Sequence, residues 1–181
     1  MNHRGTKQSR GTSEMFTHRP VQEADISLIR QFPQSESELF FMHPKGSYPL
    51  TCDQLKKAIR ERIDSTVALA DNNVAGFANF IICEPREKCV IGNVIVLPQW
   101  RRQGVGHYLV ETMTLMAFEK HQVQEVHIPC FNQNVPGLLL YPKLGFRPFK
   151  IEEWSDKQGN RVALIHMKLP RTDGEKVPIL R

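Results

Sequence analysis

The sequence lacks the features of membrane, secreted and fibrous proteins. No uncharged apolar run of about 18 or more residues occurs among its 181 residues, so we expect no membrane-spanning helix. The residues up to Met15 are polar and charged with no apolar stretch behind them, which argues against a secretory signal. With 11 glycines, 12 prolines and 40% hydrophobic residues, the chain is neither collagen-like nor largely disordered. We therefore expect a soluble globular protein, and its length fits one domain.

Paired cysteines and a strong charge of one sign are missing as well. Cys52, Cys83, Cys89 and Cys130 have neither the CxxC spacing of a zinc site nor the density of a disulfide scaffold. We therefore predict no metal site, no disulfide framework and a reducing, cytoplasmic location. The net charge is +5, part of it at the two ends of the chain, so charge alone gives no reason to expect a nucleic-acid partner.

The hydrophobic pattern divides the chain into tails, helices and strands. Residues 1–15 lack periodicity and are predicted to be a disordered tail, followed by one domain over 16–169 and a C-terminal tail over 170–181. Helical periodicity is found over 22–31, 35–42, 51–63, 105–120 and 135–144. Strands are predicted over 16–19, 66–70, 74–83, 89–96, 125–130, 146–153 and 161–168. Turn signals between the strands at 66–70, 74–83 and 89–96 indicate a meander.

The strand at 89–96 leads through a glycine-containing turn straight into the predicted helix at 105–120. The first N–H groups of a helix have no partner within the helix, and this end of the helix dipole is positive. The turn is therefore a candidate site for a diphosphate-sized anion, with four backbone N–H donors and two arginine charges. The donors would come from Gln103, Gly104, Val105 and Gly106, and the charges from Arg101 and Arg102. The alternative is a tight strand-to-helix turn whose arginines are merely solvated.

The motif Arg101-x-x-Gly104-x-Gly106 between a strand and a long helix resembles the acyl-CoA signature of the GNAT superfamily of N-acetyltransferases. In that family, the amides of the loop hold the pyrophosphate of the coenzyme. The preceding strand hydrogen-bonds the pantetheine arm through its backbone. The resemblance therefore implies that Val94, Ile95 and Val96 contact acetyl-CoA.

A second segment, residues 132–146, resembles the other signature of this family: an Asn, a helix, a Leu-Tyr pair and a Gly-Phe pair. Asn134 can cap the helix, Pro136 suits its first turn, and Gly145 can end it in a left-handed conformation. The resemblance implies that Asn134 contacts the coenzyme and that the Tyr141 hydroxyl protonates the departing thiolate. A phenol, with a pKa of about 10, is a reasonable acid for a thiolate. The alternative is that Asn134 is only a helix cap and Tyr141 only a half-buried aromatic residue.

The resemblance implies an α/β GNAT fold in a single domain, with a mixed, mostly antiparallel sheet of six to seven strands flanked by about four helices. The sheet is expected to splay between 90–96 and 125–130, where acetyl-CoA would enter. The implied activity is N-acetyl transfer from acetyl-CoA to a primary amine by direct attack in a ternary complex, without a metal. The acceptor would be a small molecule or a protein amine, with no nucleic-acid or membrane partner, and a homodimer fits the family.

The strand before the glycine turn lacks the carboxylate that this family often places there. Proton acceptors could instead be a water relay or one of six side chains, Glu36, Glu38, Glu84, His127, Glu152 and Glu153. We expect the acceptor pocket between 35–50 and the loop near 154–159. The missing carboxylate leaves an acyl-CoA-binding or sensory module without turnover as the alternative. A nucleotide-dependent enzyme is disfavoured, because neither a Walker lysine nor an acidic metal-ligating cluster accompanies the turn.

Overall fold

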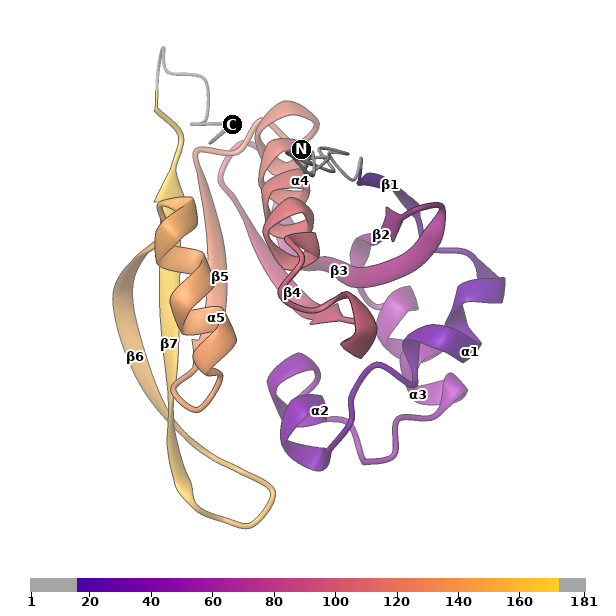
Figure 1. Cartoon of the computed structure of the whole chain (residues 1–181). Coiled ribbons are helices and arrows are strands. Elements are labelled where there is room, and N and C mark those ends of the chain that lie inside the picture. Colours follow the sequence, from indigo (N-terminus) through magenta and orange to yellow (C-terminus); the bar gives the residue numbers. More distant parts are fainter. Residues whose placement is uncertain (1–15, 173–181) are drawn as a thin grey trace, which may run out of the picture.

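A computed structural model, which describes residues 16–172, places a seven-stranded sheet at the centre of the molecule (Figure 1). The strand order is β1-β2-β3-β4-β5-β7-β6. The strands are β1 (Thr17–Pro20), β2 (Ile63–Ala70), β3 (Asn73–Glu84), β4 (Lys88–Val96), β5 (Glu125–Phe131), β6 (Arg147–Ser155) and β7 (Arg161–Pro170). Only β4 and β5 pair in parallel. This confirms the mixed, mostly antiparallel sheet and its meander of β2, β3 and β4.

Within residues 16–172, five α-helices accompany the sheet, one in each of the five segments with helical periodicity, whereas the family resemblance implied about four. They are α1 (Ile26–Ile29), α2 (Glu36–Met42), α3 (Cys52–Arg60), α4 (Val105–Glu119) and α5 (Val135–Leu140). Hydroxyl oxygens cap two of them, since Ser35 accepts a hydrogen bond from the N–H of Glu38 and Thr51 from that of Gln54. Within residues 16–172, none of the helices has the length and apolar character needed to cross a membrane.

Several element boundaries differ from those predicted. The helix predicted over 51–63 ends at Arg60, because Ile63, which fits the helical spacing from Ile59, begins β2 instead. The segment 22–31 is split into a 3-10 turn, Glu23–Asp25, and the short helix α1. β7 extends to Pro170 and so includes the first residue assigned to the C-terminal tail. The tail predicted over 1–15 lies outside the described residues.

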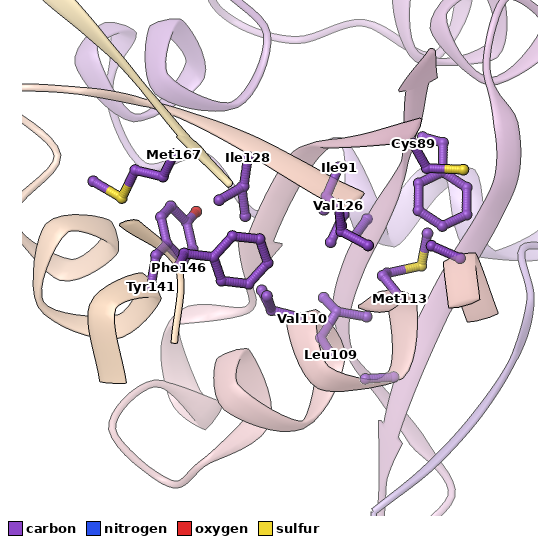
Figure 2. Packing of buried hydrophobic residues seen from close by; sticks show 14 of the residues in the cluster. Cys89, Ile91, Leu109, Val110, Met113, Val126, Ile128, Tyr141, Phe146 and Met167 are labelled. Atoms are coloured by element: carbon purple, nitrogen blue, oxygen red, sulfur yellow. The ribbon is translucent and has the colours of Figure 1, made fainter. Parts of the chain in front are cut away.

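The two faces of the sheet are covered by different helices. On one face, Leu109 and Met113 of α4 are buried in a cluster with Phe80 and Ile91 of the sheet (Figure 2). On the other face, residues of α1, α2 and α3 pack on Phe77 and other sheet residues. α4 approaches β3 closely at Gly76, where an added Cβ would lie 3.1 Å from Val105 Cγ1 and 3.3 Å from Leu109 Cδ2. Glycine at this position thus allows the first turns of α4 to pack directly on the strand.

β4 and β5 separate soon after they begin. Their pairing is limited to the first three residues of each strand, from Lys88 opposite Glu125 to Val90 opposite His127. Beyond Val90, β4 pairs only with β3, while β5 continues along β7. A bulge at Asn93, whose φ is 52°, bends β4 in this region. The predicted splay of the sheet is therefore present, and it leaves one backbone edge of β4 unpaired (Figure 1).

The cysteines depart from the sequence prediction. Cys83 and Cys89 form a disulfide in this structure, whereas no disulfide was predicted. The β3–β4 register sets the two residues directly opposite each other, with Cα atoms 4.1 Å apart. The short turn between the strands creates this pair, which neither cysteine count nor CxxC spacing reveals. Cys52 and Cys130 are not paired.

We predict that Leu109→Ala lowers the free energy of unfolding by about 2–5 kcal/mol, because it removes a fully buried side chain between α4 and the sheet. Leu139→Ala is the matched control, since Leu139 is 62% exposed and its loss should change stability by no more than about 0.5 kcal/mol. Urea unfolding of both variants tests this. Equal losses in the two variants would contradict the packing described here.

Candidate active site

The first turn of α4 presents a row of unbonded backbone N–H groups. Gly104 stands at the N-cap with a φ of 95°, a left-handed conformation that glycine adopts readily. The first backbone hydrogen bond of the helix runs from the N–H of Tyr108 to the carbonyl of Gly104, at 3.0 Å. Among the described residues, no well-aligned hydrogen bond to a backbone carbonyl uses the N–H groups of residues 103–107. These groups and the positive end of the helix dipole form an anion-binding geometry.

The two arginines of the turn have different surroundings. The Arg101 guanidinium forms a two-point contact with the Glu38 carboxylate of α2, at 2.8 and 2.9 Å. Its Nε also donates to the Val96 carbonyl at 3.1 Å. Arg102, by contrast, is exposed and forms no ion pair with any described residue. Only Arg102 therefore leaves its side-chain charge available to an anion.

The Arg101 contact keeps Glu38 ionised. Partial burial opposes ionisation of this carboxyl, but hydrogen bonds from Arg101 and from the N–H of Gln34 outweigh it and lower its pKa. Arg101 thereby ties helix α2 to the glycine turn across 63 positions of sequence. Sequence reasoning assigned Arg101 to the anion and Glu38 to a list of possible bases, and it did not foresee that the two pair.

The residues predicted to bind the pantetheine arm, 94–96, are the last three of β4, where one edge of the strand is unpaired. On its other edge, Ile95 pairs with Phe77 and Val96 with Gly76 of β3. The side chains of Val94 and Val96 pack against the same buried cluster as α4 and Tyr141. The structure thus brings the strand at 94–96, the start of α4 and Tyr141 into one region.

The residues of the second motif lie on the opposite side of the splay, on α5 and the turn after it. Asn134 caps α5 as predicted, with its Oδ1 accepting from the N–H of Gly137 at 3.2 Å. α5 packs tightly on β5, because a Cβ on Gly137 would lie 2.9 Å from Cys130 Sγ and 3.1 Å from Tyr141 Cε2. Gly145 ends the following 3-10 turn, Tyr141–Leu144, with a φ of 92°.

Tyr141 is more deeply buried than a half-buried aromatic residue, with 5% of its surface exposed. Its ring lies beside Phe146, on the side of the cluster that holds Ile128 and Met167 (Figure 2). The pKa of the phenol is raised, mainly by burial and to a smaller extent by the nearby Cys130. The hydroxyl therefore stays protonated at neutral pH. Burial also raises the pKa of the Cys130 thiol to about 12. Both groups are therefore neutral.

A cavity of about 220 Å³ lies between α2 and the β6–β7 loop. Its lining residues are Glu36, Ser37, Phe40, Phe41, Gln133, Asp156, Lys157 and Gln158. Gln158 reaches across to α2, where its amide nitrogen donates to the Glu36 carboxylate at 2.8 Å. The ring centroid of Phe40 lies 4.4 Å from that of Phe131, the last residue of β5, and the two rings are tilted against each other. The cavity thus joins the two segments expected to form the acceptor pocket.

The candidate proton acceptors are distributed unevenly. Four of them have partners on the strands: Glu84 pairs with Lys88, His127 with Glu125, Glu152 with His166 and Glu153 with Arg161. None of these four lines the cavity. Glu38 is held by Arg101, so Glu36 is the carboxylate of the predicted set that faces the cavity.

Two buried asparagines escaped the sequence analysis as site residues. The Asn93 amide nitrogen donates to the Met42 carbonyl of α2 at 2.9 Å, but its Oδ1 has no partner among the described residues. Asn79, fully buried on β3 two residues after Phe77, lacks partners there for both polar side-chain atoms. Unpaired buried amides are costly unless water or a ligand satisfies them. The sequence signal that could have identified them is a polar asparagine within a segment that otherwise predicts a strand.

Comparison with known proteins identifies the family. The sequence profile of the acetyltransferase (GNAT) family matches residues 28–146. The chain belongs to this family. An N-alpha-acetyltransferase of Sulfurisphaera tokodaii is 34% identical over 59 residues, which are 33% of this chain and 35% of that protein. The match therefore spans only about a third of that relative's length.

Solved structures share the fold. The ribosomal-protein-S18-alanine N-acetyltransferase of Escherichia coli aligns with a TM-score of 0.67 and 22% identity, covering 90% of this chain and 99% of that one. The yncA protein of Salmonella typhimurium, solved with its cofactor acetyl-CoA, aligns with a TM-score of 0.68 and 18% identity, covering 90% and 97%. At these identities the likeness concerns the fold alone, and it confirms the predicted GNAT fold.

We predict that Glu38→Gln destabilises the chain by roughly 1.5–3 kcal/mol at neutral pH, because it leaves Arg101 without its charged partner. The pKa of Glu38 is lowered in the folded state, so its contribution is present above its ordinary pKa of 4.5 and is lost as the pH falls through the lowered value. Urea unfolding of wild type and variant between neutral and acidic pH should show this difference shrink.

Glu153→Gln is the control, because Glu153 forms a similar but exposed pair with Arg161. An exposed pair is worth about 0–1 kcal/mol. The account would be wrong if Glu38→Gln were as mild as this control at neutral pH.

Proposed function

We propose that the protein is an N-acetyltransferase that moves the acetyl group of acetyl-CoA to a primary amine by direct attack in a ternary complex. The observation that carries the proposal is the juxtaposition of the unpaired β4 edge with the unbonded amides at the start of α4. An extended arm that ends in a diphosphate needs both features, a strand edge for its amides and a helix start for its phosphates.

The proposed coenzyme site follows from this geometry. The N–H groups of Gln103, Gly104, Val105 and Gly106 would bind the pyrophosphate, and the exposed Arg102 would add its charge. The β4 backbone at 94–96 would pair with the pantetheine arm. Because the side chain of Arg101 is held by Glu38, we assign it the role of a positioning residue rather than a ligand of the anion. Asn134, at the start of α5, would approach the coenzyme from the opposite side of the splay.

The cavity between α2 and the β6–β7 loop is the proposed acceptor site. Its carboxylates, Glu36 and Asp156, suit a cationic amine, and the Phe40 and Phe41 side chains suit an apolar group attached to it. One similar protein is named an N-alpha-acetyltransferase and another a ribosomal-protein-S18-alanine N-acetyltransferase, and these names support peptide α-amines as the first acceptors to test. Small primary amines belong in the same panel.

The chemistry requires two proton transfers. The attacking amine must lose a proton, since alkyl ammonium groups have a pKa of about 10.4. We propose that Glu36, which lines the cavity, or a water relay accepts it. The N–H groups of β4 at 94–96 would stabilise the oxyanion formed when the amine attacks. As the C–S bond breaks, Tyr141 would give its proton to the departing thiolate.

The first test of the coenzyme site is a titration of acetyl-CoA into the chain and into Gly104→Glu. The substitution puts a carboxylate at the start of α4, so we expect binding in the micromolar range, about −8 kcal/mol, to be lost. Gly159→Glu is the matched control: Gly159 also has a positive φ, 81°, but lies in the β6–β7 turn with no atom near its Cβ position. Acetyl-CoA binding that survives in Gly104→Glu would refute the assignment of the pyrophosphate site.

The second test separates catalysis from binding. Tyr141→Phe should lower kcat by about 10²–10⁴-fold, since it removes the proposed acid, while acetyl-CoA affinity stays within about twofold. Steady-state kinetics with a panel of peptide and small amines, together with the same titration, measures both. If wild type binds acetyl-CoA but acetylates no amine, the alternative of a binding or sensory module holds. If Tyr141→Phe turns over normally, Tyr141 is not the acid.

A further inference from the structure

Two cysteines and a histidine from three separate segments meet at the end of the molecule opposite the proposed coenzyme loop. Cys83 is the next-to-last residue of β3, Cys89 is the second residue of β4, and His121 follows the C-terminus of α4. One potential ligand atom from each of the three lies within 4.8 Å of the others. Cys89 and Tyr141 lie at opposite ends of the cluster in Figure 2. The acetyl-transfer proposal makes no use of these residues.

We propose that, in the reduced chain, Cys83, Cys89 and His121 bind a zinc-like divalent cation. Two thiolates and one imidazole are ligands that zinc prefers, and a tetrahedral ion needs one further ligand, which water would supply. Within residues 16–172, this is the group of three Cys, His or acidic side chains whose potential ligand atoms all lie within 4.8 Å of one another. The site is independent of the proposed function.

A carboxylate already orients the histidine. Asp64 Oδ2 lies 2.6 Å from His121 Nε2, which leaves Nδ1 of the ring free for a metal. A carboxylate that holds a metal-binding histidine from behind is the usual outer partner of such ligands. Lys120 contacts the other Asp64 oxygen, so both oxygens of this carboxylate have a partner that holds it in place.

The backbone holds the three segments together without a metal. The N–H of Arg86, in the β3–β4 turn, donates to the His121 carbonyl at 3.0 Å. The N–H of Gln124 donates to the Glu87 carbonyl in the same turn at 2.9 Å. The His121 ring also packs edge-on against Phe80 at 5.7 Å. The proposed ligands are thus preorganised, which reduces the entropy lost on binding.

The disulfide of this structure and the proposed metal site are alternative states of the same two sulfurs. Both sulfurs project from one point of the hairpin, because Cys83 and Cys89 are register partners. The metal-bound state requires both thiols to be reduced and deprotonated, so binding should release protons. A reducing compartment would favour this state over the disulfide.

The test uses the untagged full chain, reduced and freed of metal, with the thiols counted before titration. Cobalt(II) is the probe, because thiolate ligands produce an intense charge-transfer absorption that carboxylates and imidazoles alone do not. We expect saturation at one cobalt per chain, displacement of cobalt by zinc, and a higher Tm with zinc than without it. No charge-transfer band at one equivalent in the reduced chain would overturn the proposal.

Four variants locate the site. Cys83→Ser and His121→Gln should weaken cobalt binding by at least about 100-fold, and Asp64→Asn by about 10–100-fold. Asparagine suits position 64, since Asp64 has a φ of 50° and asparagine tolerates that conformation. Cys52→Ser is the matched control and should leave binding unchanged, because Cys52 lies outside the cluster. Unchanged affinity in Cys83→Ser or His121→Gln would also overturn the site. Neither result would bear on acetyl transfer, which is measured separately.

Discussion

The structure depends above all on how β4 is held. On one edge it pairs with β3, where the space left by Gly76 lets Val105 and Leu109 of α4 pack on the sheet. On the other edge its pairing with β5 ends at Val90. This combination fixes an unpaired strand edge beside a helix start. Unsatisfied backbone groups are normally costly, and here they become the binding groups of the proposed coenzyme site.

One ion pair connects the proposed coenzyme site to the proposed acceptor site. Arg101 follows the 3-10 turn Pro98–Trp100 after β4, and its contact with Glu38 anchors the helix whose first residue, Glu36, lines the cavity. The Gln158 contact to Glu36 links the β6–β7 loop to the same helix. The proposed direct transfer in a ternary complex relies on holding two substrates in register, and this series of contacts would supply that positioning. The activity proposed here thus needs no carboxylate on β4.

Features with local causes were accessible from the sequence. Gly104, Gly145 and Asn134 were predicted because turns and caps depend on neighbouring residues alone. The contacts of Arg101 with Glu38, and of Cys83 with Cys89 and His121, depend on tertiary packing and pair register, which a single sequence does not encode in its spacing. The buried amides of Asn79 and Asn93 were missed for the same reason, since a strand pattern does not reveal what a side chain faces. The fold and family were therefore predictable from the sequence, whereas these side-chain contacts were not.

A crystal structure of the chain with acetyl-CoA tests the central claim most directly. We predict pyrophosphate oxygens within about 3 Å of the N–H groups of residues 103–106, and a pantetheine arm hydrogen-bonded to β4 at 94–96. The thioester sulfur should lie beside the Tyr141 hydroxyl. Acetyl-CoA bound elsewhere, with the amides at the start of α4 still unbonded, would contradict the account.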